Sequence, residues 1–337
     1  MIRVMYASDR FGPRMRVLVT GVAGFIGFHT ARRLCSEGHQ VIGIDNLNSY
    51  YSVELKQARL ALLAECRNFR FQKLDVADKQ ALLDVFAHNA FEQVIHLAAQ
   101  AGVRYSIDNP DLYAQSNLVG FLNVLEACRA HRPAHLVFAS SSSVYGLNDR
   151  LPYATTDPVD QPVSFYAATK RANELMAHAY SHLYGIPTTG LRFFTVYGPW
   201  GRPDMAPFKF TDAILNGRAI DLYNDGAMSR DFTYIDDIVE ALVRLLVLPP
   251  ANDAGVCNKV YNIGFGGPVK LLQFVECLEE SLGIPAIKNF LPLQPGDVVD
   301  TWADTRELEE RLGFRPQVAV PVGVQSFVDW YREYYRV

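Results

Sequence analysis

Two side chains that can move a proton lie one helical turn apart near the middle of the sequence. Tyr166 and Lys170 are four residues apart in a segment with helical spacing, so they share one face of the helix. Upstream, the serine run 140–143 follows an apolar strand. An ammonium beside a phenol favours the phenolate, which can take a proton from a substrate hydroxyl. The pair alone is common on helix surfaces, so its assignment depends on the rest of the sequence.

A glycine-rich turn early in the chain indicates a site for a phosphate-bearing ligand. Gly21, Gly24 and Gly27 recur at every third position between an apolar strand and a helical segment that opens with Phe25 and Ile26. Such glycines allow a tight turn, close approach of a diphosphate to the backbone, and close packing of helix on strand. The helix N-terminus then faces the anion. The context of strand, turn and helix favours a dinucleotide site over an ordinary glycine-rich turn.

Asp45 indicates which dinucleotide binds. It ends the next strand at the spacing of about 20 residues that dinucleotide sites show. Its carboxylate can accept hydrogen bonds from the adenosine ribose and would repel a 2′-phosphate. The neighbouring Asn46 and Asn48 are polar but not cationic, so NAD is favoured over NADP. Asp75 and Val76 end the third strand, where they can contact adenine, or Asp75 can instead be a helix cap or loop acid.

These residues require a particular scaffold. Apolar runs that predict strands alternate with helical patterns, which implies a parallel sheet covered on both faces. We predict an α/β fold with a Rossmann-type, doubly wound parallel sheet over 15–193, joined by about 232–264. A smaller second domain takes in about 194–231 and 265–337, and residues 1–14 form a peripheral leader. The predicted strands are 15–20, 40–45, 69–75, 93–97, 135–140 and 188–193, and the predicted helices are 25–37, 53–66, 79–89, 111–131 and 165–184.

Bulk properties exclude several classes of protein. The chain has 337 residues, 49% of them hydrophobic, with a net charge of −4, so a nucleic-acid partner is not expected. No apolar run approaches the length of a membrane span, and the leader lacks the apolar core of a signal peptide. The five scattered cysteines indicate a reducing, cytoplasmic compartment, and the eight histidines have no metal-binding spacing.

Taken together, these motifs resemble the extended short-chain dehydrogenase/reductase superfamily. The resemblance rests on 20–27, Asp45, the segment His96-Leu97-Ala98-Ala99, the segment 140–146 and the Tyr166/Lys170 pair. It implies that Tyr166 is the base, that Lys170 is its partner and holds the nicotinamide ribose, and that Ser141 is the main catalytic hydroxyl. It adds Leu97, Ala98 and Ala99 to the NAD site. A homodimer through the helices near 111–131 and 165–184 is the expectation for this superfamily.

The serines before Val144 restrict the reaction. Dehydratases of nucleotide sugars carry an Asp-Glu pair at the positions of Ser142 and Ser143, and UDP-glucuronate decarboxylases usually carry glutamate at the second position. Neither carboxylate is present here. The resemblance therefore implies 4-epimerisation of a UDP-sugar through a transient 4-keto intermediate, with the hydride returned to the opposite face. A non-catalytic NAD-binding regulator is the alternative class, against which the intact Ser141, Tyr166 and Lys170 argue.

Three segments, 45–51, 101–106 and 191–205, resemble UDP-glucuronate 4-epimerases. This resemblance implies that Arg202 faces the C6 carboxylate, that Thr195 contacts the sugar or its phosphate, and that Ser142 and Ser143 are further donors. A guanidinium suits a planar carboxylate because it can donate two parallel hydrogen bonds. Arg202 could instead bind a phosphate or form a surface salt bridge. A 4-epimerase of UDP-glucose or of UDP-N-acetylglucosamine is the second candidate, and a UDP-glucuronate decarboxylase the third.

The second domain is thereby predicted to bind the UDP-sugar. Arg230 matches the phosphate-binding arginine of the family. Asp297 belongs to a second nucleotide-side loop, where it either contacts a ribose or positions Arg230. Many relatives have an arginine at the place of Gln294, which puts phosphate binding there in doubt. Lys209 is a weaker candidate for the same role.

Overall fold

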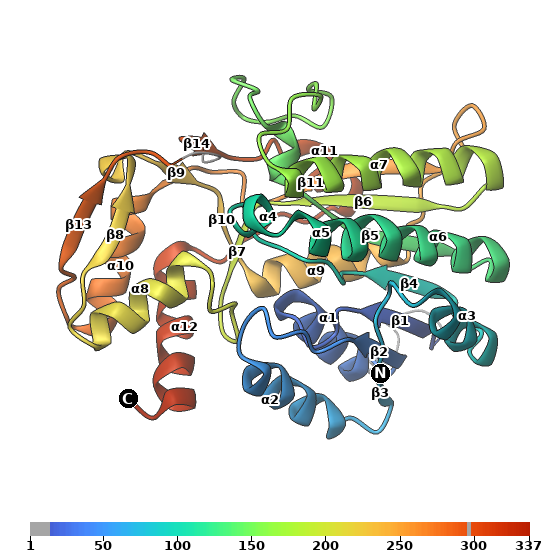
Figure 1. Cartoon of the computed structure of the whole chain (residues 1–337), viewed down its shortest axis with the longest axis horizontal. Coiled ribbons are helices and arrows are strands. Elements are labelled where there is room, and N and C mark those ends of the chain that lie inside the picture. Colours follow the sequence, from blue (N-terminus) through green and yellow to red (C-terminus); the bar gives the residue numbers. More distant parts are fainter. Residues whose placement is uncertain (1–13, 295–297) are drawn as a thin grey trace, which may run out of the picture.

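Seven parallel strands form the centre of the computed structural model, which describes residues 14–294 and 298–337 (Figure 1). Their order is β11-β6-β5-β4-β1-β2-β3. Strands β1 and β4–β6 are buried on both faces along almost their whole length, as the apolar runs predict. The strands are β1 (Arg16–Thr20), β2 (Gln40–Asp45), β3 (Phe69–Lys73), β4 (Gln93–His96), β5 (His135–Ser141), β6 (Thr188–Phe193) and β11 (Asn258–Ile263). The predicted α/β class with a Rossmann-type parallel sheet is confirmed.

Helices cover both faces of this sheet. One layer contains α1 (Phe25–Ser36), α2 (Val53–Ala64) and α9 (Ile235–Leu246), and the other contains α3 (Lys79–His88), α6 (Gly120–His131) and α7 (Phe165–Tyr184) (Figure 1). Helix α7 begins at its predicted residue because the Ser164 side chain accepts a hydrogen bond from the Ala167 amide at 3.1 Å. The strand order reverses between β1 and β4, and in such sheets ligands bind outside the carboxyl ends of the strands at this point.

The single helix predicted over 111–131 is wrong in detail. The segment instead consists of α5 (Pro110–Tyr113), a π-helical stretch (Ala114–Val119) and α6. The helical backbone is continuous through this stretch, and within it the Asn117 carbonyl accepts a hydrogen bond from the Asn173 side chain at 2.7 Å. The Asn117 side chain donates to Thr169 Oγ1 at 3.0 Å. These side-chain contacts to α7 accompany the wider turn, and such π segments are frequent near functional sites.

A second region lies beside the sheet, at the left of Figure 1. A hydrophobic core runs from β1 and α1 through α9 to Phe274 and Phe327, so this region packs directly against the first. Within the predicted 232–264, α9 covers a face of the main sheet and β11 joins its edge, while β10 pairs with β7 outside it. The elements of this second region are β7 (Thr195–Tyr197), α8 (Ala206–Leu215), β8 (Ile220–Tyr223), β9 (Ser229–Arg230), β10 (Phe232–Tyr234), β12 (Val269–Lys270), α10 (Leu271–Leu282), β13 (Lys288–Leu291), β14 (Asp300–Thr301) and α12 (Val320–Tyr335). Two short helices complete the described chain, α4 (Tyr105–Asp108) and α11 (Arg306–Leu312).

Candidate active site

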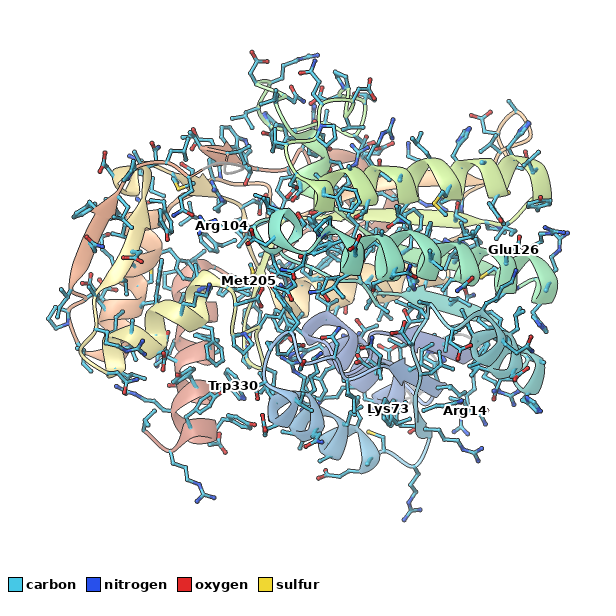
Figure 2. All side chains as sticks on the ribbon, viewed as in Figure 1. Arg14, Lys73, Arg104, Glu126, Met205 and Trp330 are labelled. Atoms are coloured by element: carbon cyan, nitrogen blue, oxygen red, sulfur yellow. The ribbon has the colours of Figure 1, made fainter. Side chains whose placement is uncertain are left out.

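A cleft of about 930 Å³ opens at the carboxyl ends of the central strands, facing α8 and β8. Figure 2 shows two of its lining residues, Arg104 and Met205, at the junction of the two regions. The predicted cofactor residues that line it are Gly21, Gly24, Phe25, Ile26, Gly27, Asp45, Asn46, Asn48, Val76, Leu97, Ala98, Ala99, Tyr166 and Lys170. The predicted catalytic and substrate residues that line it are Ser141, Ser142, Ser143, Thr195, Arg202 and Arg230. Asp297 and the leader through residue 13 lie outside the described residues.

The glycine turn is a cradle that larger residues would fill. Gly21 has a φ of +71°, and a Cβ there would stand 2.7 Å from the Ala98 nitrogen. A Cβ at Gly27 would stand 2.2 Å from the Gly21 oxygen, so α1 can pack on the turn only with glycine at this position. Gly24 caps α1 without a side-chain hydrogen bond, so the first amides of the helix remain available to an anion. This geometry fits the diphosphate of a dinucleotide.

Asp45 lies at the end of β2 beside this turn. Its carboxylate accepts hydrogen bonds from the Ala23 amide at 3.1 Å and the Leu47 amide at 2.8 Å. Burial raises the pKa of Asp45, while these amides and the charge of Lys56 act against the rise. Lys56 is a cleft residue that sequence reasoning missed, because it follows on the next helix. Its ammonium donates to the Asn48 carbonyl at 2.7 Å. Burial lowers the pKa of Lys56, and the negative charge of Asp45 acts against this fall.

Asp75 does not line the cleft, and its carboxylate instead accepts hydrogen bonds that hold the neighbouring loop. It is not among the described lining residues. One carboxylate oxygen accepts a hydrogen bond from the Asn46 side chain at 2.9 Å, and the other accepts one from the Ala77 amide at 2.9 Å. Of its two predicted roles, the geometry agrees with the loop acid. Val76, its neighbour, does line the cleft.

Ser141, Tyr166 and Lys170 meet between the end of β5 and the start of α7. Ser141 Oγ donates to Ser143 Oγ at 3.1 Å, and Ser141 also acts to lower the pKa of the Tyr166 phenol. The Lys170 ammonium donates to the Ala139 carbonyl at 2.8 Å and stands 6.0 Å from the centre of the Tyr166 ring. Burial lowers the pKa of Lys170 to about 8. The three groups are therefore held by the backbone of one strand end and one helix.

The electrostatics of Tyr166 differ from the expectation. Burial raises the pKa of its phenol, while the Ser141 hydrogen bond and the charge of Arg202 act to lower it. Lys170, whose ammonium donates to the Ala139 carbonyl, is not among the groups that shift this pKa. The sequence spacing predicts that Tyr166 and Lys170 share one helix face, but it does not indicate that the Ala139 carbonyl binds the lysine ammonium.

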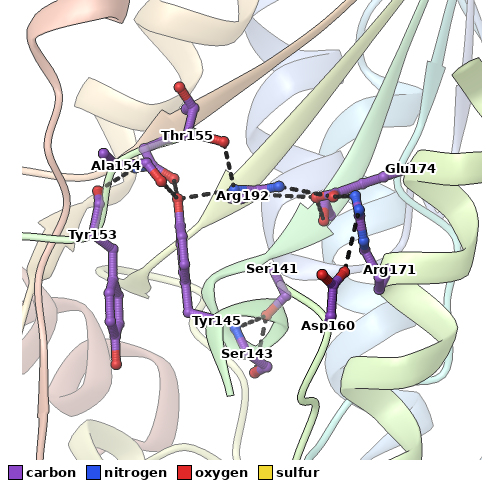
Figure 3. Close-up of polar contacts among 12 residues, drawn as sticks. Ser141, Ser143, Tyr145, Tyr153, Ala154, Thr155, Asp160, Arg171, Glu174 and Arg192 are labelled. Carbon is purple, nitrogen blue, oxygen red and sulfur yellow. Dashed lines mark hydrogen bonds and ion pairs between the residues drawn. The ribbon is translucent and has the colours of Figure 1, made fainter. Parts of the chain in front are cut away.

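A buried polar network links Arg192 of β6 to Glu174 of α7 and to Tyr145, in the segment after Ser141 (Figure 3). Arg192 of β6 donates to both oxygens of Glu174 on α7, at 2.8 and 2.9 Å, and to the Tyr145 hydroxyl at 3.0 Å. Ser140 donates to the same carboxylate at 2.6 Å. Burial acts to raise the pKa of Glu174, but Arg192 and Ser140 hold it below its usual value. The network fixes the residue before Ser141 to the helix that carries Tyr166 and Lys170.

Arg202 lies in the cleft but is already paired. Its Nε donates to Asp204 Oδ1 at 3.0 Å, and its Nη2 donates to Asp204 Oδ2. The pair is partly buried, with exposed fractions of 22% and 20% for the two side chains. Thr195 of β7 lines the same cleft, as do Ser142 and Ser143. The arrangement offers a guanidinium and hydroxyl donors to an anionic group.

Arg59, which sequence reasoning also missed, anchors the loop before Arg202. Its fully buried guanidinium donates to the Ala23 carbonyl at 2.7 Å, in the glycine turn. It also donates to the carbonyls of Trp200 at 2.7 Å and Gly201 at 3.3 Å. One side chain of α2 thus joins the predicted cofactor turn to the predicted sugar loop. No local sequence signal marks it.

The far end of the cleft is rich in cationic side chains. Arg230 Nη1 and Nη2 donate to the carbonyls of Val299 at 2.7 Å and Val298 at 2.8 Å. The Arg104 guanidinium stacks 4.5 Å from the centre of the Tyr223 ring. The other cations that line this cleft include Lys209 and Arg218. A charged diphosphate suits such a lining.

Comparisons with known proteins agree with this geometry. A family model described as the NAD dependent epimerase/dehydratase family matches residues 17–264. A Rhizobium meliloti protein named a probable UDP-glucuronate 4-epimerase is 52% identical over 335 residues, covering 96% of this chain and 98% of that protein. The structure of the Bacillus cereus UDP-glucuronic acid 4-epimerase with UDP-glucuronic acid and NAD has a TM-score of 0.84 at 33% identity, covering 95% of this chain and 100% of that one. The UDP-glucose 4-epimerase of Thermotoga maritima has a TM-score of 0.85 at 31% identity, with the same coverage. The fold is therefore shared by epimerases of different UDP-sugars, and the choice of sugar rests on side chains.

Proposed function

The chain belongs to the NAD dependent epimerase/dehydratase family, and on this premise we propose that it converts UDP-glucuronate to UDP-galacturonate by inverting C4. The observation that carries the choice of sugar is the guanidinium of Arg202 in the same cleft as Ser141, Tyr166 and Lys170. Relatives named UDP-glucuronate 4-epimerases match nearly the whole chain. An uncharged sugar would leave Arg202 without an anionic partner from the substrate.

NAD fits the part of the cleft nearest β1 and β2. The N-terminus of α1 and its glycines would hold the diphosphate, and Asp45 would accept hydrogen bonds from the adenosine ribose. Leu97, Ala98 and Ala99 would line the nicotinamide side, where Lys170 would hold the second ribose. When bound, NAD supplies the hydride acceptor for oxidation at C4 and the donor for its reversal. The reaction is redox-neutral, so the protein needs no second electron partner.

The protein's own contribution to the chemistry is a proton relay. Tyr166 takes the proton from the C4 hydroxyl as that carbon is oxidised, and returns it after the keto sugar has turned over. Ser141 would hydrogen-bond the same phenol and keep it aimed at the sugar oxygen. Positioned acid–base groups of this kind contribute about 10²–10⁴-fold in rate.

Arg202 both selects the sugar and protects it. A 4-keto-glucuronate is a β-keto acid, which loses carbon dioxide when its carboxylate stands perpendicular to the ketone plane. Donors from Arg202, Ser142, Ser143 and Thr195 would hold the carboxylate in another plane. Arg230 would bind the diphosphate, and the nucleotide-side role of Asp297 stays a prediction from the sequence. The region of α8, β8 and α10 would thus act as the UDP-sugar-binding part, and the parallel sheet as the NAD-binding part.

A homodimer is part of the proposal. Leu122 of α6 and Leu175 and Leu183 of α7 are exposed, by 40%, 55% and 65%, on two helices that pack side by side. A second copy pairing through the same helices would cover them, and symmetric dimers are the commonest assembly. All five cysteines are free thiols, which supports a cytoplasmic place. Within the described part of the chain, no helix is long and apolar enough to cross a membrane.

One incubation tests the function. Purified protein mixed with UDP-glucuronate should yield UDP-galacturonate and no UDP-xylose, as resolved by chromatography and mass. UDP-glucose, offered separately, should remain unchanged. Formation of UDP-galactose without UDP-galacturonate would instead establish the neutral-sugar epimerase.

A further inference from the structure

Three loops meet behind Arg202, and they contain the three segments that resemble UDP-glucuronate 4-epimerases. The Tyr50 hydroxyl, from the loop after β2, donates to Asp204 Oδ2 at 3.1 Å. Its ring packs 4.8 Å from that of Tyr105, from the loop after β4. Gly102 has a φ of +107°, and a Cβ there would stand 2.5 Å from the Tyr50 hydroxyl oxygen. All of these residues line the cleft.

The contact between Arg202 and Asp204 uses only one edge of the guanidinium. Nε and Nη2 donate to the two oxygens of Asp204. An arginine has five N–H donors in a planar fork. The second edge, formed by Nη1 and Nη2, is therefore still able to bind another carboxylate with two parallel hydrogen bonds.

We propose that Asp204, held by Tyr50, is a positioning residue that fixes Arg202 so that its second edge meets the C6 carboxylate of the substrate. The inference rests on the proposed function. Asp204 also nearly cancels the charge of Arg202, so it opposes the binding of a second carboxylate while it sets the plane in which that carboxylate is held. The ion pair therefore weakens the binding of the substrate carboxylate but fixes the orientation in which it is bound.

This trade separates the proposal from a merely structural role. A residue that only stabilises the loop would, when replaced, weaken binding and turnover together. Asp204 should behave differently, because its removal lifts an unfavourable charge and loosens the guanidinium at the same time. A displacement of about 1 Å in a positioned group can cost about 10²-fold in rate.

Asp204→Asn tests the proposal, because it keeps the shape of the side chain and removes its charge. We expect the KM for UDP-glucuronate to be unchanged or lower, and kcat to fall about 10–100-fold. The fraction of product that has lost carbon dioxide, measured by mass, should rise. The Kd of UDP alone, measured by calorimetry, should stay within about twofold, because the diphosphate is assigned to Arg230 and not to this pair. A twofold change in Kd corresponds to about 0.4 kcal/mol.

The chain offers a matched control and a milder variant. Arg306 and Asp304 form the same side-on pair, with Nε–Oδ1 at 2.9 Å and Nη2–Oδ2 at 2.6 Å, outside the residues that line the cleft. Asp304→Asn should leave kcat, KM and the products unchanged. Tyr50→Phe keeps the ion pair and removes only the donor to Asp204, so it should shift kcat and products in the same direction by a smaller factor. If Asp204→Asn does not fold, the kcat and products of Tyr50→Phe test the proposal instead.

The outcomes distinguish this inference from the proposed function. Wild-type protein that leaves UDP-glucuronate unchanged would refute both. Wild-type turnover together with an Asp204→Asn variant of normal kcat and normal products would refute the inference alone. A parallel loss of UDP affinity and activity in Asp204→Asn would also overturn it, because the residue would then support the whole loop.

Discussion

Replacing Arg192 by methionine removes the cation against which Glu174 is buried. Both side chains are almost inaccessible, at 3% and 2% exposed. Methionine keeps much of the volume of arginine but provides no donor. The Glu174 carboxylate would keep the Ser140 hydroxyl at 2.6 Å and Arg171 Nη1 at 3.1 Å. It would therefore be left with one neutral donor and one half-exposed cation.

The expected loss follows from this remaining set of partners. Breaking a buried ion pair by removing one partner costs about 3–5 kcal/mol. Because Arg171 stays close, we expect a loss of about 3 kcal/mol and, with an unfolding entropy of about 2.1 cal/mol/K per residue, a fall in Tm of about 4 °C for a chain of this length. Arg171→Met is the control. Arg171 is 28% exposed, so solvent screens its charge and we expect its removal to cost no more than about 1 kcal/mol.

The loss should also depend on pH. In the wild type the pKa of Glu174 is held below its usual value, so its stabilising effect is present above the unfolded pKa and lost as pH falls through the folded one. In Arg192→Met burial dominates and raises that pKa, so the variant regains stability as pH falls and the carboxylate takes a proton. The difference in Tm between wild type and variant should shrink between about pH 8 and pH 5. Differential scanning calorimetry across this range measures it, and a difference that stays constant with pH would refute the reasoning.

Three further outcomes follow from the cleft. Tyr166→Phe should lower kcat by about 10²–10⁴-fold while the Kd of UDP stays unchanged in calorimetry, and near-normal turnover would remove Tyr166 from the relay. Arg202→Lys should weaken turnover of UDP-glucuronate strongly, because an ammonium cannot hold Asp204 and a substrate carboxylate through two edges. It should also release UDP-4-keto-pentose, seen by mass, and an equal loss of UDP affinity would make Arg202 a phosphate ligand. The purified protein should carry NAD, measured by absorbance and mass after denaturation, because its reaction returns the hydride; an absolute need for added NADP would contradict the reading of Asp45.

The parts of the site that could be predicted from sequence are those fixed by local spacing. The glycines of the turn, Asp45 at the end of β2, and the Tyr166/Lys170 pair each follow from the period of one strand or one helix. These residues line one cleft because parallel strands end at the same edge of a sheet. The order of the elements follows from the same alternation, which is why the fold class was predictable.

The parts that were missed depend on contacts between distant segments. The π-helical turn within the predicted long helix contains Asn117, which is bonded to a partner 56 residues away. Lys170 turns to the Ala139 carbonyl, 31 residues before it. Glu174 and Arg192 are 18 residues apart on consecutive elements, and their pairing depends on how β6 runs back along α7. No pattern along the chain encodes which of several polar groups a buried cation will choose.

The buried guanidinium of Arg59 has a consequence for engineering. It holds the carbonyls of Ala23, Trp200 and Gly201 at once, so the loop before Arg202 is shaped against a helix that lies about 140 residues earlier in the chain. A loop grafted from a relative with another sugar would bring its own carbonyl positions but not the matching helix. To change the sugar specificity of this scaffold, the loop before Arg202 should therefore be transferred together with α2. Chimeras that replace only one of the two should lose the original specificity without gaining a new one.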